Sequence, residues 1–250
     1  MRREQEAIVL IVEARGENDR RVVMLSDQGE LIDAHAPAAR RSQKRFGAAL
    51  QPGTHLLARW ERRREGGVTV LEEAQPLMPP PSPDPLERFY AVAHSMETIA
   101  AFAREGAEDP RLYRLLHTVL ERFAANDPID PLCRYTESWT LRLAGLLPDL
   151  VTCAVCGRSL GNGPIAIAPE RGAFCKTDRP AGALLLSAEA ARWLVITRSA
   201  PAADLPALST NADADLRSLL HALIKSFTDR ELVSWRGLTA LRRPARKKGG

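Results

Sequence analysis

The sequence predicts an α+β protein in which a small β-barrel precedes a helical domain. Short β-branched runs separated by turn residues fill the N-terminal part, and apolar residues at helical spacing follow. Between them, "PLMPPPSPDP" breaks both strand and helix, because proline fixes φ and removes a backbone donor. With 250 residues and 45% hydrophobic content, the chain is long enough to bury a core. The expected organisation is a barrel at 1–78, a connector at 79–85, a helical domain at 86–240 and a basic tail at 241–250.

The barrel is expected to contain five short strands. The first is "EAIVLIVEA", and "RRVVMLSDQGELIDAHA" supplies two more around a Gln28-Gly29 turn. "THLLARWERR" and "GVTVLEEA" supply a further pair joined by Gly66-Gly67. This number and length of strands fits a Greek-key barrel of the oligonucleotide-binding kind, and it equally fits a small SH3-like barrel.

Three helices are expected directly after the connector, and two more near the C-terminus. Asp109-Pro110 and Asp130-Pro131 mark two helix starts, since an aspartate N-cap followed by proline at the first helical position is a specific start signal. The expected helices are "LERFYAVAHSMETIAAFAREG", "PRLYRLLHTVLERFAA", "PLCRYTESWTLRLAGLL", "SAEAARWLVITR" and "ADLRSLLHALIKSFTDREL".

Between the third and fourth helices, residues 151–180 contain a metal-binding pattern. Its spacing is C-x2-C-x18-C-x2-D, with Cys153 and Cys156 in the first pair and Cys175 and Asp178 in the second. Two such pairs at this separation are typical of zinc sites, and a carboxylate oxygen is an acceptable zinc ligand beside sulfur. The alternatives are an empty site and a disulfide. Cys133 lies within an expected helix and is interpreted as a small buried apolar residue.

A structural role for this metal is favoured over a catalytic one. Zinc deaminases combine PCxxC with an HxE element, but Thr152 precedes Cys153 and no histidine is followed two residues later by glutamate. An alternative remains a zinc-dependent hydrolase or deaminase using a half-open three-cysteine site, for which Glu170 is the one candidate base close in sequence. No glycine-rich phosphate loop or GxSxG motif is present.

Basic residues cluster at two places in the barrel, although the net charge is only +4. Lysine and arginine neutralise phosphates and release counterions, and neighbouring aromatics such as Phe46 and Trp60 can stack on bases. The clusters therefore predict nucleic-acid binding, and the simpler alternative for each is a solvated loop. A sequence-specific DNA-binding regulator is a further alternative, but no recognition-helix pattern supports it. The predicted DNA-binding residues are Arg40, Arg41, Lys44, Arg45, Arg59, Arg62, Arg63 and Arg64.

The N-terminal stretch that includes "ARRSQKRFGAALQPG", then "LRLAGLLPDL" and "CAVCG", then "SWRGL" near the end, together resemble the RecO family of bacterial recombination mediators. The resemblance runs nearly end to end and rests on the order and spacing of these pieces. It implies an OB-fold barrel followed by a helical domain with a zinc-ribbon-like insertion. Family members usually present four cysteines at the metal, so Asp178 stands where the fourth is usual.

The resemblance also implies a non-enzymatic function. It implies binding to single- and double-stranded DNA, annealing of complementary strands, and contact with the acidic tail of single-strand-binding protein. With RecR, such a protein helps to load RecA. Because no long apolar run or signal-peptide pattern occurs, we expect a cytoplasmic, nucleoid-associated protein with no membrane partner.

Overall fold

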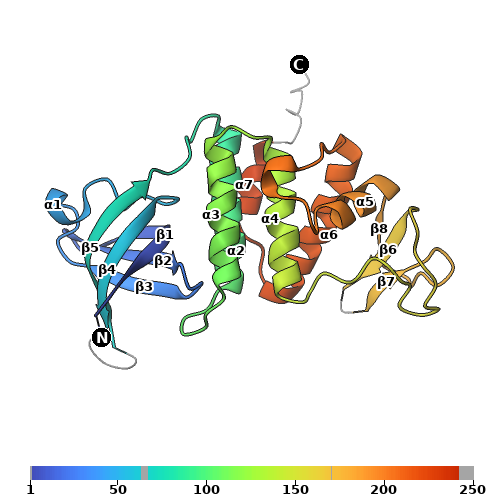
Figure 1. The fold of residues 1–250 in the computed structure, drawn as a ribbon, viewed down its shortest axis with the longest axis horizontal. Coiled ribbons are helices and arrows are strands. Elements are labelled where there is room, and N and C mark those ends of the chain that lie inside the picture. Colours follow the sequence, from blue (N-terminus) through green and yellow to red (C-terminus); the bar gives the residue numbers. More distant parts are fainter. Residues whose placement is uncertain (1, 63–66, 170, 242–250) are drawn as a thin grey trace, which may run out of the picture.

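The computed structural model describes residues 2–62, 67–169 and 171–241. A five-stranded barrel lies at one end of the long axis, a layer of helices lies in the middle, and a small sheet lies at the other end (Figure 1). Among the helices in these ranges, none has both the length and the hydropathy of a membrane-spanning segment.

The barrel closes in the strand order β1-β2-β3-β5-β4. β3 and β5 pair in parallel and the other neighbours are antiparallel, with β1 joined to β4 to close the barrel. This order, with a short helix between β3 and β4, is that of the OB-fold and not of an SH3-like barrel. The elements are β1 (Arg2–Arg15), β2 (Asp19–Ser26), β3 (Leu31–Ala36), α1 (Gln43–Phe46), β4 (His55–Arg62) and β5 (Thr69–Met78).

Both faces of β1 are buried from Ala7 to Leu10, which explains the apolar residues in the middle of the strand. Ala7 and Val9 point into the barrel core, whereas Ile8 and Leu10 pack with Leu25 against the helices. Alternation of side chains along a strand produces this division. The helical layer therefore covers the outer side of β1 and β2.

The helical domain is formed by α2 (Leu86–Phe102), α3 (Pro110–Ala124), α4 (Ile129–Leu143), α5 (Ala188–Ile196), the 3-10 turn η1 (Ala202–Asp204), α6 (Thr210–Thr228) and α7 (Val233–Leu241). As expected, Asp109 is the N-cap of α3: its carboxylate accepts the Arg111 N–H. The expected N-cap at Asp130 is wrong. The N-cap of α4 is Pro128, so Asp130 lies within the first turn, where its charge still complements the helix dipole. α7 was not predicted as a separate helix.

A buried polar cluster joins α2, α4, α6 and α7. Arg134 and Glu137 are both fully buried and paired, with Arg134 Nη2 3.2 Å from Glu137 Oε1. His94 Nε2 lies 2.7 Å from the same carboxylate oxygen, and its Nδ1 lies 3.2 Å from the Ser234 hydroxyl. Asp213 of α6 faces Arg134 at 3.6 Å. Buried charges need such partners, so the cluster fixes the mutual positions of these helices. Cys133 beside it is buried, as predicted.

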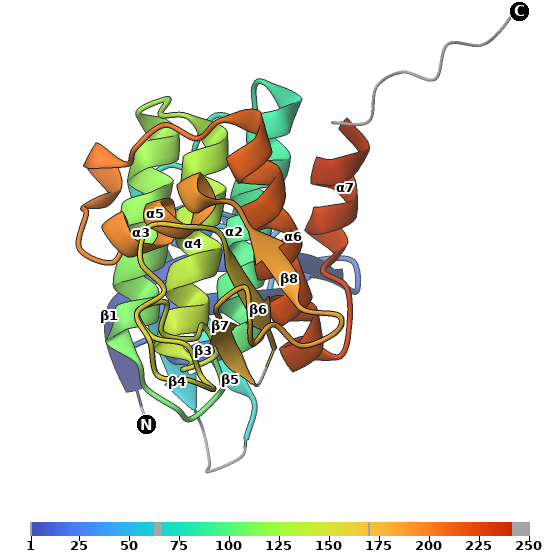
Figure 2. The same cartoon turned by 90° about the vertical axis from the view of Figure 1, so that its right-hand side faces the viewer.

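A three-stranded antiparallel sheet, in the order β7-β6-β8, lies against the far side of the helices (Figure 2). Its strands are β6 (Ile165–Ala168), β7 (Gly172–Phe174) and β8 (Leu184–Leu186). The predicted metal-binding segment ended at residue 180, but β8 lies beyond it. The structural unit is therefore longer than the predicted segment. We call residues 151–186 the cysteine element.

Two sets of polar contacts hold the barrel to the helical layer. Near the β2–β3 turn, Leu31 N–H donates to the Arg104 carbonyl and Gly106 N–H donates to the Glu30 carboxylate. On the other side of the junction, the Tyr113 hydroxyl of α3 donates to Glu6 at 3.0 Å. These contacts and the shared apolar packing make one continuous body.

Candidate functional site

Four ligand-type side chains meet in the cysteine element. Cys153 and Cys156 come from the turn before β6, and Cys175 and Asp178 follow β7; their ligand atoms all lie within 4.8 Å of one another. Cys156 Sγ is 4.0 Å from Cys175 Sγ, and Asp178 Oδ2 is 3.1 Å from Cys175 Sγ. Sulfur atoms around a tetrahedral zinc lie roughly 3.8 Å apart, given Zn–S bonds of about 2.3 Å. The four residues therefore fit a metal ion.

The surrounding groups favour the charged forms of two ligands. Backbone N–H groups, first that of Cys156, lower the pKa of the Cys153 thiol. Thiol hydrogen bonds, first that of Cys156, lower the pKa of Asp178. The hydrogen bond to Asp178 raises the pKa of the Cys175 thiol instead. Thiolate and carboxylate are the ligating forms, so the surroundings favour them at Cys153 and Asp178 but not at Cys175.

The predicted basic loop, residues 37–46, lies at the outer end of the barrel around α1 (Figure 1). Arg40, Arg41 and Lys44 are exposed. Arg40 Nη1 donates to the Glu17 carbonyl at 3.1 Å, which ties the loop to the β1–β2 turn. Within the described ranges, the side chains of Arg41 and Lys44 have neither a hydrogen bond nor an ion pair. This loop therefore presents positive charge to the solvent.

Arg45 is oriented differently from its neighbours. Its guanidinium donates to the Pro37 carbonyl at 2.7 Å and to the Ser42 hydroxyl, and it lies 4.9 Å from the Phe46 ring centre. Phe46 is buried in the barrel core. Arg45 thus holds the loop in shape, and the ring of Phe46 is not free to stack on a base.

The second basic cluster is largely neutralised by carboxylates. Arg59 on β4 lies 2.9 Å from Glu4 and 2.9 Å from Glu73, on the strands at either side. Arg62 lies 3.6 Å from Glu30 and 3.3 Å from Glu105. Trp60 between them is a buried core residue. Arg63 and Arg64, the candidate base Glu170 and the tail at 242–250 lie outside the described residues.

Sequence patterns did not reveal a groove between α4, α5 and the loop that leads into the cysteine element. This groove has a volume of about 480 Å³, with Trp139, Leu147 and Leu194 among its apolar walls. Its charged residues are Arg111, Arg142, Arg198 and Asp149, and Arg111 is paired with Asp109 at 2.8 Å. Burial, and then the charge of Arg198, lowers the pKa of Arg142 to about 10. Arg142 donates to the Leu194 carbonyl, but its Nη1 is buried without a hydrogen-bond partner in the described ranges.

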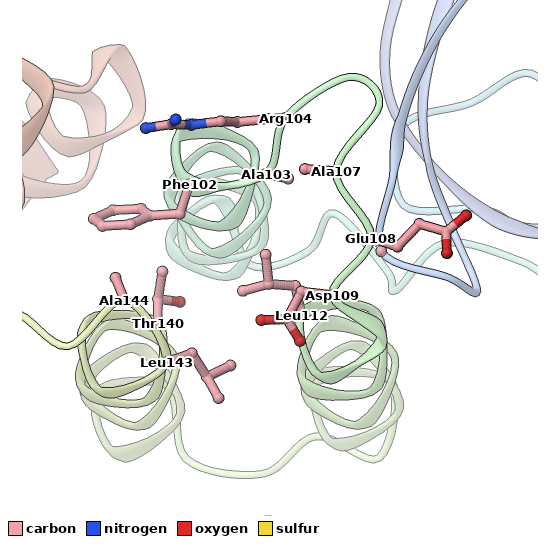
Figure 3. A pocket seen from close by; sticks show the side chains of 11 residues that line it. Phe102, Ala103, Arg104, Ala107, Glu108, Asp109, Leu112, Thr140, Leu143 and Ala144 are labelled. Atoms are coloured by element: carbon pink, nitrogen blue, oxygen red, sulfur yellow. The ribbon is translucent and has the colours of Figure 1, made fainter.

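A smaller hollow of about 130 Å³ lies nearby, between the ends of α2, α3 and α4 (Figure 3). Leu112, Thr140 and Leu143 surround it, and the Asp109 carboxylate is turned toward it. The two hollows therefore differ in charge: three arginines and Asp149 line the groove, whereas Arg104, Glu108 and Asp109 line the smaller hollow.

Comparison with protein families covers almost the whole chain. Residues 1–80 match the family model "Recombination protein O N terminal", and residues 84–236 match "Recombination protein O C terminal". The chain belongs to the RecO family. The OB-fold barrel and the helical domain of this RecO-family chain correspond to these two matched regions.

Individual relatives agree with this assignment. A protein of Koribacter versatilis named "DNA repair protein RecO" is 29% identical over 237 residues, which cover 94% of this chain and 97% of the relative. A protein of the same name from Anaeromyxobacter sp. (strain K) is 31% identical, covering 92% of this chain and 93% of the relative. A third, from Desulforudis audaxviator, is 38% identical over 61% of this chain and 60% of its own length.

Membership in the RecO family makes this chain a recombination and repair protein and not an enzyme. The two alternatives from the sequence, a zinc-dependent hydrolase or deaminase and a sequence-specific regulator, are therefore set aside. The structure brings together all four predicted metal ligands. It also separates the basic residues into an exposed loop and an ion-paired strand. The basic groove was missed because its arginines come from α3, α4 and the end of α5, which no short motif links.

Proposed function

We propose that this chain is a recombination mediator that binds single- and double-stranded DNA and anneals complementary strands. With RecR, it would help to load RecA onto DNA coated by single-strand-binding protein. The observation that carries the DNA contact is the exposed basic loop at the free end of an OB-fold barrel. Phosphate contacts carry no sequence information, so binding is expected to be independent of sequence.

Among the eight predicted DNA-binding residues, Arg40, Arg41 and Lys44 are the principal phosphate contacts in this proposal. Their charges face solvent without competing carboxylates, whereas a phosphate at Arg59 or Arg62 must displace an ion pair. Arg59 and Arg62, together with Arg63 and Arg64, extend the path along the barrel. Arg45 contributes mainly by supporting the loop.

Replacing Arg40, Arg41 and Lys44 with alanine is expected to weaken DNA binding and to flatten its salt dependence. Each lost phosphate contact lowers the slope of log K against log salt by about 0.7–0.9, so the triple variant should lose roughly 2–3 units. Fluorescence anisotropy with a labelled oligonucleotide across a salt series measures this. The matched control replaces Arg114, Lys225 and Arg230 of the helical domain, and the slope should not change. An unchanged slope for the loop variant would remove the loop from the DNA site.

We infer that the groove binds the acidic C-terminal tail of single-strand-binding protein. Arg142 and Arg198 complement an acidic peptide, and the apolar walls accommodate its hydrophobic side chains. Arg111 can contribute only by sharing its ion pair with Asp109. An anion would also satisfy the buried Nη1 of Arg142, a donor that is costly to leave unpaired. The smaller hollow in Figure 3 suits an acidic ligand less well, because two carboxylates, Glu108 and Asp109, line it beside a single arginine.

Replacing Arg142 with alanine is expected to weaken binding of this peptide by about tenfold or more, because a half-buried charged contact is lost. Anisotropy of a labelled peptide with the tail sequence gives the affinity. Arg114 is exposed on the same helix as Arg111 but outside the groove, so Arg114→Ala serves as the control. Equal affinities for wild type and Arg142→Ala would place the tail elsewhere.

The metal in this proposal is Zn²⁺, bound by Cys153, Cys156, Cys175 and Asp178. Four protein ligands leave no open position for water or substrate, which is typical of structural zinc. Its contribution is to the local fold of the cysteine element and not to chemistry.

The decisive assay for the mediator function is annealing of two complementary strands, each coated with the cognate single-strand-binding protein. Acceleration that disappears when the coating protein lacks its acidic tail supports the proposal. DNA binding without any acceleration would contradict it.

A further inference from the structure

The cysteine element forms part of the wall of the groove. Val151, the first residue of the element, lines it beside Leu150, and both residues also line an adjoining hollow of about 250 Å³. Ser159 and Gly161, on the other side of the Cys153–Cys156 turn, line that second hollow. The two hollows therefore adjoin each other at Val151.

Hydrogen bonds transmit the shape of the metal-binding turn to this wall. Leu160 N–H donates to the Val151 carbonyl at 2.9 Å, and Cys153 N–H donates to the Arg158 carbonyl at 2.9 Å. Gly157 N–H closes the turn onto the Cys153 carbonyl at 3.0 Å. These backbone hydrogen bonds thus connect Val151 to the turn that contains Cys153 and Cys156.

Apolar packing alone supports this turn weakly. One face of the small sheet packs on the main core through Ile165, Ile167, Ala173 and Leu186. The turn itself lies on a separate cluster formed by Cys153, Ala166, Ala168, Phe174 and Ala183. Alanine methyl groups each contribute only about 0.8 kcal/mol on burial, so the cluster is small for a separate core. Without a cation, the four side chains are joined only by weak thiol hydrogen bonds, from Cys153 and Cys175 to the Asp178 carboxylate at 3.4 and 3.1 Å. Bonds from one metal ion to all four residues would add a much stronger interaction to the turn.

We propose that metal binding at Cys153, Cys156, Cys175 and Asp178 controls the affinity of the groove for an acidic peptide, while DNA binding at the barrel is independent of the metal. This inference rests on the proposed function of the groove. The second half follows from the architecture, because the barrel and the cysteine element lie at opposite ends of the molecule (Figure 1). The metal-free protein would still bind DNA but would bind the acidic peptide more weakly.

The test compares the full-length protein with and without its metal. Metal is removed with a chelator and counted by the colour change of a zinc indicator. The probes are the labelled acidic tail peptide and a labelled single-stranded oligonucleotide. We expect metal removal to weaken peptide binding by about tenfold and to leave oligonucleotide binding unchanged. Adding zinc back should restore the peptide affinity.

Variants of the fourth ligand separate metal binding from other effects. Asp178→Ala should reduce metal content and peptide affinity together. Asp178→Cys should retain zinc, and with it peptide binding, at chelator concentrations that strip the wild type, since thiolate is the stronger zinc ligand. Arg179→Ala changes an exposed neighbour and should behave as wild type.

The outcomes distinguish the two levels of the proposal. Metal-free protein that binds the peptide normally, while Arg142→Ala does not, would leave the groove assignment standing and overturn the metal link. Normal peptide binding by Arg142→Ala would overturn the groove assignment itself. Loss of oligonucleotide binding together with the metal would show global unfolding and would also overturn the link.

Discussion

Gly29 allows the barrel to contact the start of α3 directly. It sits in the β2–β3 turn with φ +79°, a conformation that residues with a side chain rarely adopt. A Cβ atom at this position would lie 1.9 Å from the carbonyl oxygen of Asp109, the N-cap of α3. The absence of a side chain at Gly29 therefore allows the close contact between the two domains.

Gly29→Ala is expected to lower the free energy of unfolding by about 3 kcal/mol or more, because backbone strain adds to a clash with a capped helix. Gly16 provides the matched control: its φ is +68°, and a Cβ atom added there would meet nothing within 4 Å. Gly16→Ala should cost only about 1 kcal/mol. Urea denaturation measures both. Equal losses would mean that the contact with Asp109 is unimportant.

At the residue scale, the sequence indicated which side chains carry charge or could bind a metal, but it did not show which residues form ion pairs with them. It named all four residues of the cluster that could hold a metal, because their spacing is local. It predicted Arg59 and Arg62 as DNA-binding residues together with Arg40 and Arg41, because the sequence does not show which arginines are ion-paired. The carboxylates that pair with Arg59 and Arg62 come from distant parts of the chain, and only the closed barrel brings them together.

Among the elements, α7 depends on another helix for its start. Glu97 of α2 accepts hydrogen bonds from the N–H groups of Val233 and Ser234 and from the Ser234 hydroxyl. Burial alone would raise the pKa of Glu97, but these hydrogen bonds outweigh it and hold the pKa below its ordinary value of 4.5. The Glu97 carboxylate of α2 thus caps the N-terminus of α7.

Glu97→Ala is expected to destabilise the docked α7 by about 1–2 kcal/mol. Hydrogen exchange of the amides in 233–241 should accelerate, and that of α3 should change little. Because the folded-state pKa is lowered, this stabilisation is present above pH 4.5 and is lost as the pH falls through the folded-state value. The difference between wild type and variant should therefore shrink in acid. A constant difference would mean that the charge of Glu97 is not responsible.

The elements with local signals were predicted well. Asp109-Pro110 marked the true start of α3, and apolar spacing located α2 to α6. Asp130 failed as an N-cap because α4 begins before it, at Ile129. α7 was missed because its cap comes from Glu97, far away in the sequence, and no N-cap signal precedes it in the chain.

For the whole molecule, the two buried faces of β1 decide the arrangement. The continuous apolar run predicted a strand correctly, but it could not show that Ile8 and Leu10 face helices and not solvent. This packing covers one side of the barrel and directs the basic loop outward. The separation between the proposed DNA-binding loop and the proposed peptide groove follows from it, so that in the proposed function both ligands can bind at once.

The capping of α7 by α2 has a consequence for biosynthesis. The barrel can fold early during translation, because all its strand pairs lie within the first part of the chain. The buried pair of His94 and Glu137 acquires its Ser234 neighbour only when the last segment emerges. The helical domain therefore reaches its final packing after translation ends, and a nascent chain would acquire a folded barrel before its C-terminal half is complete.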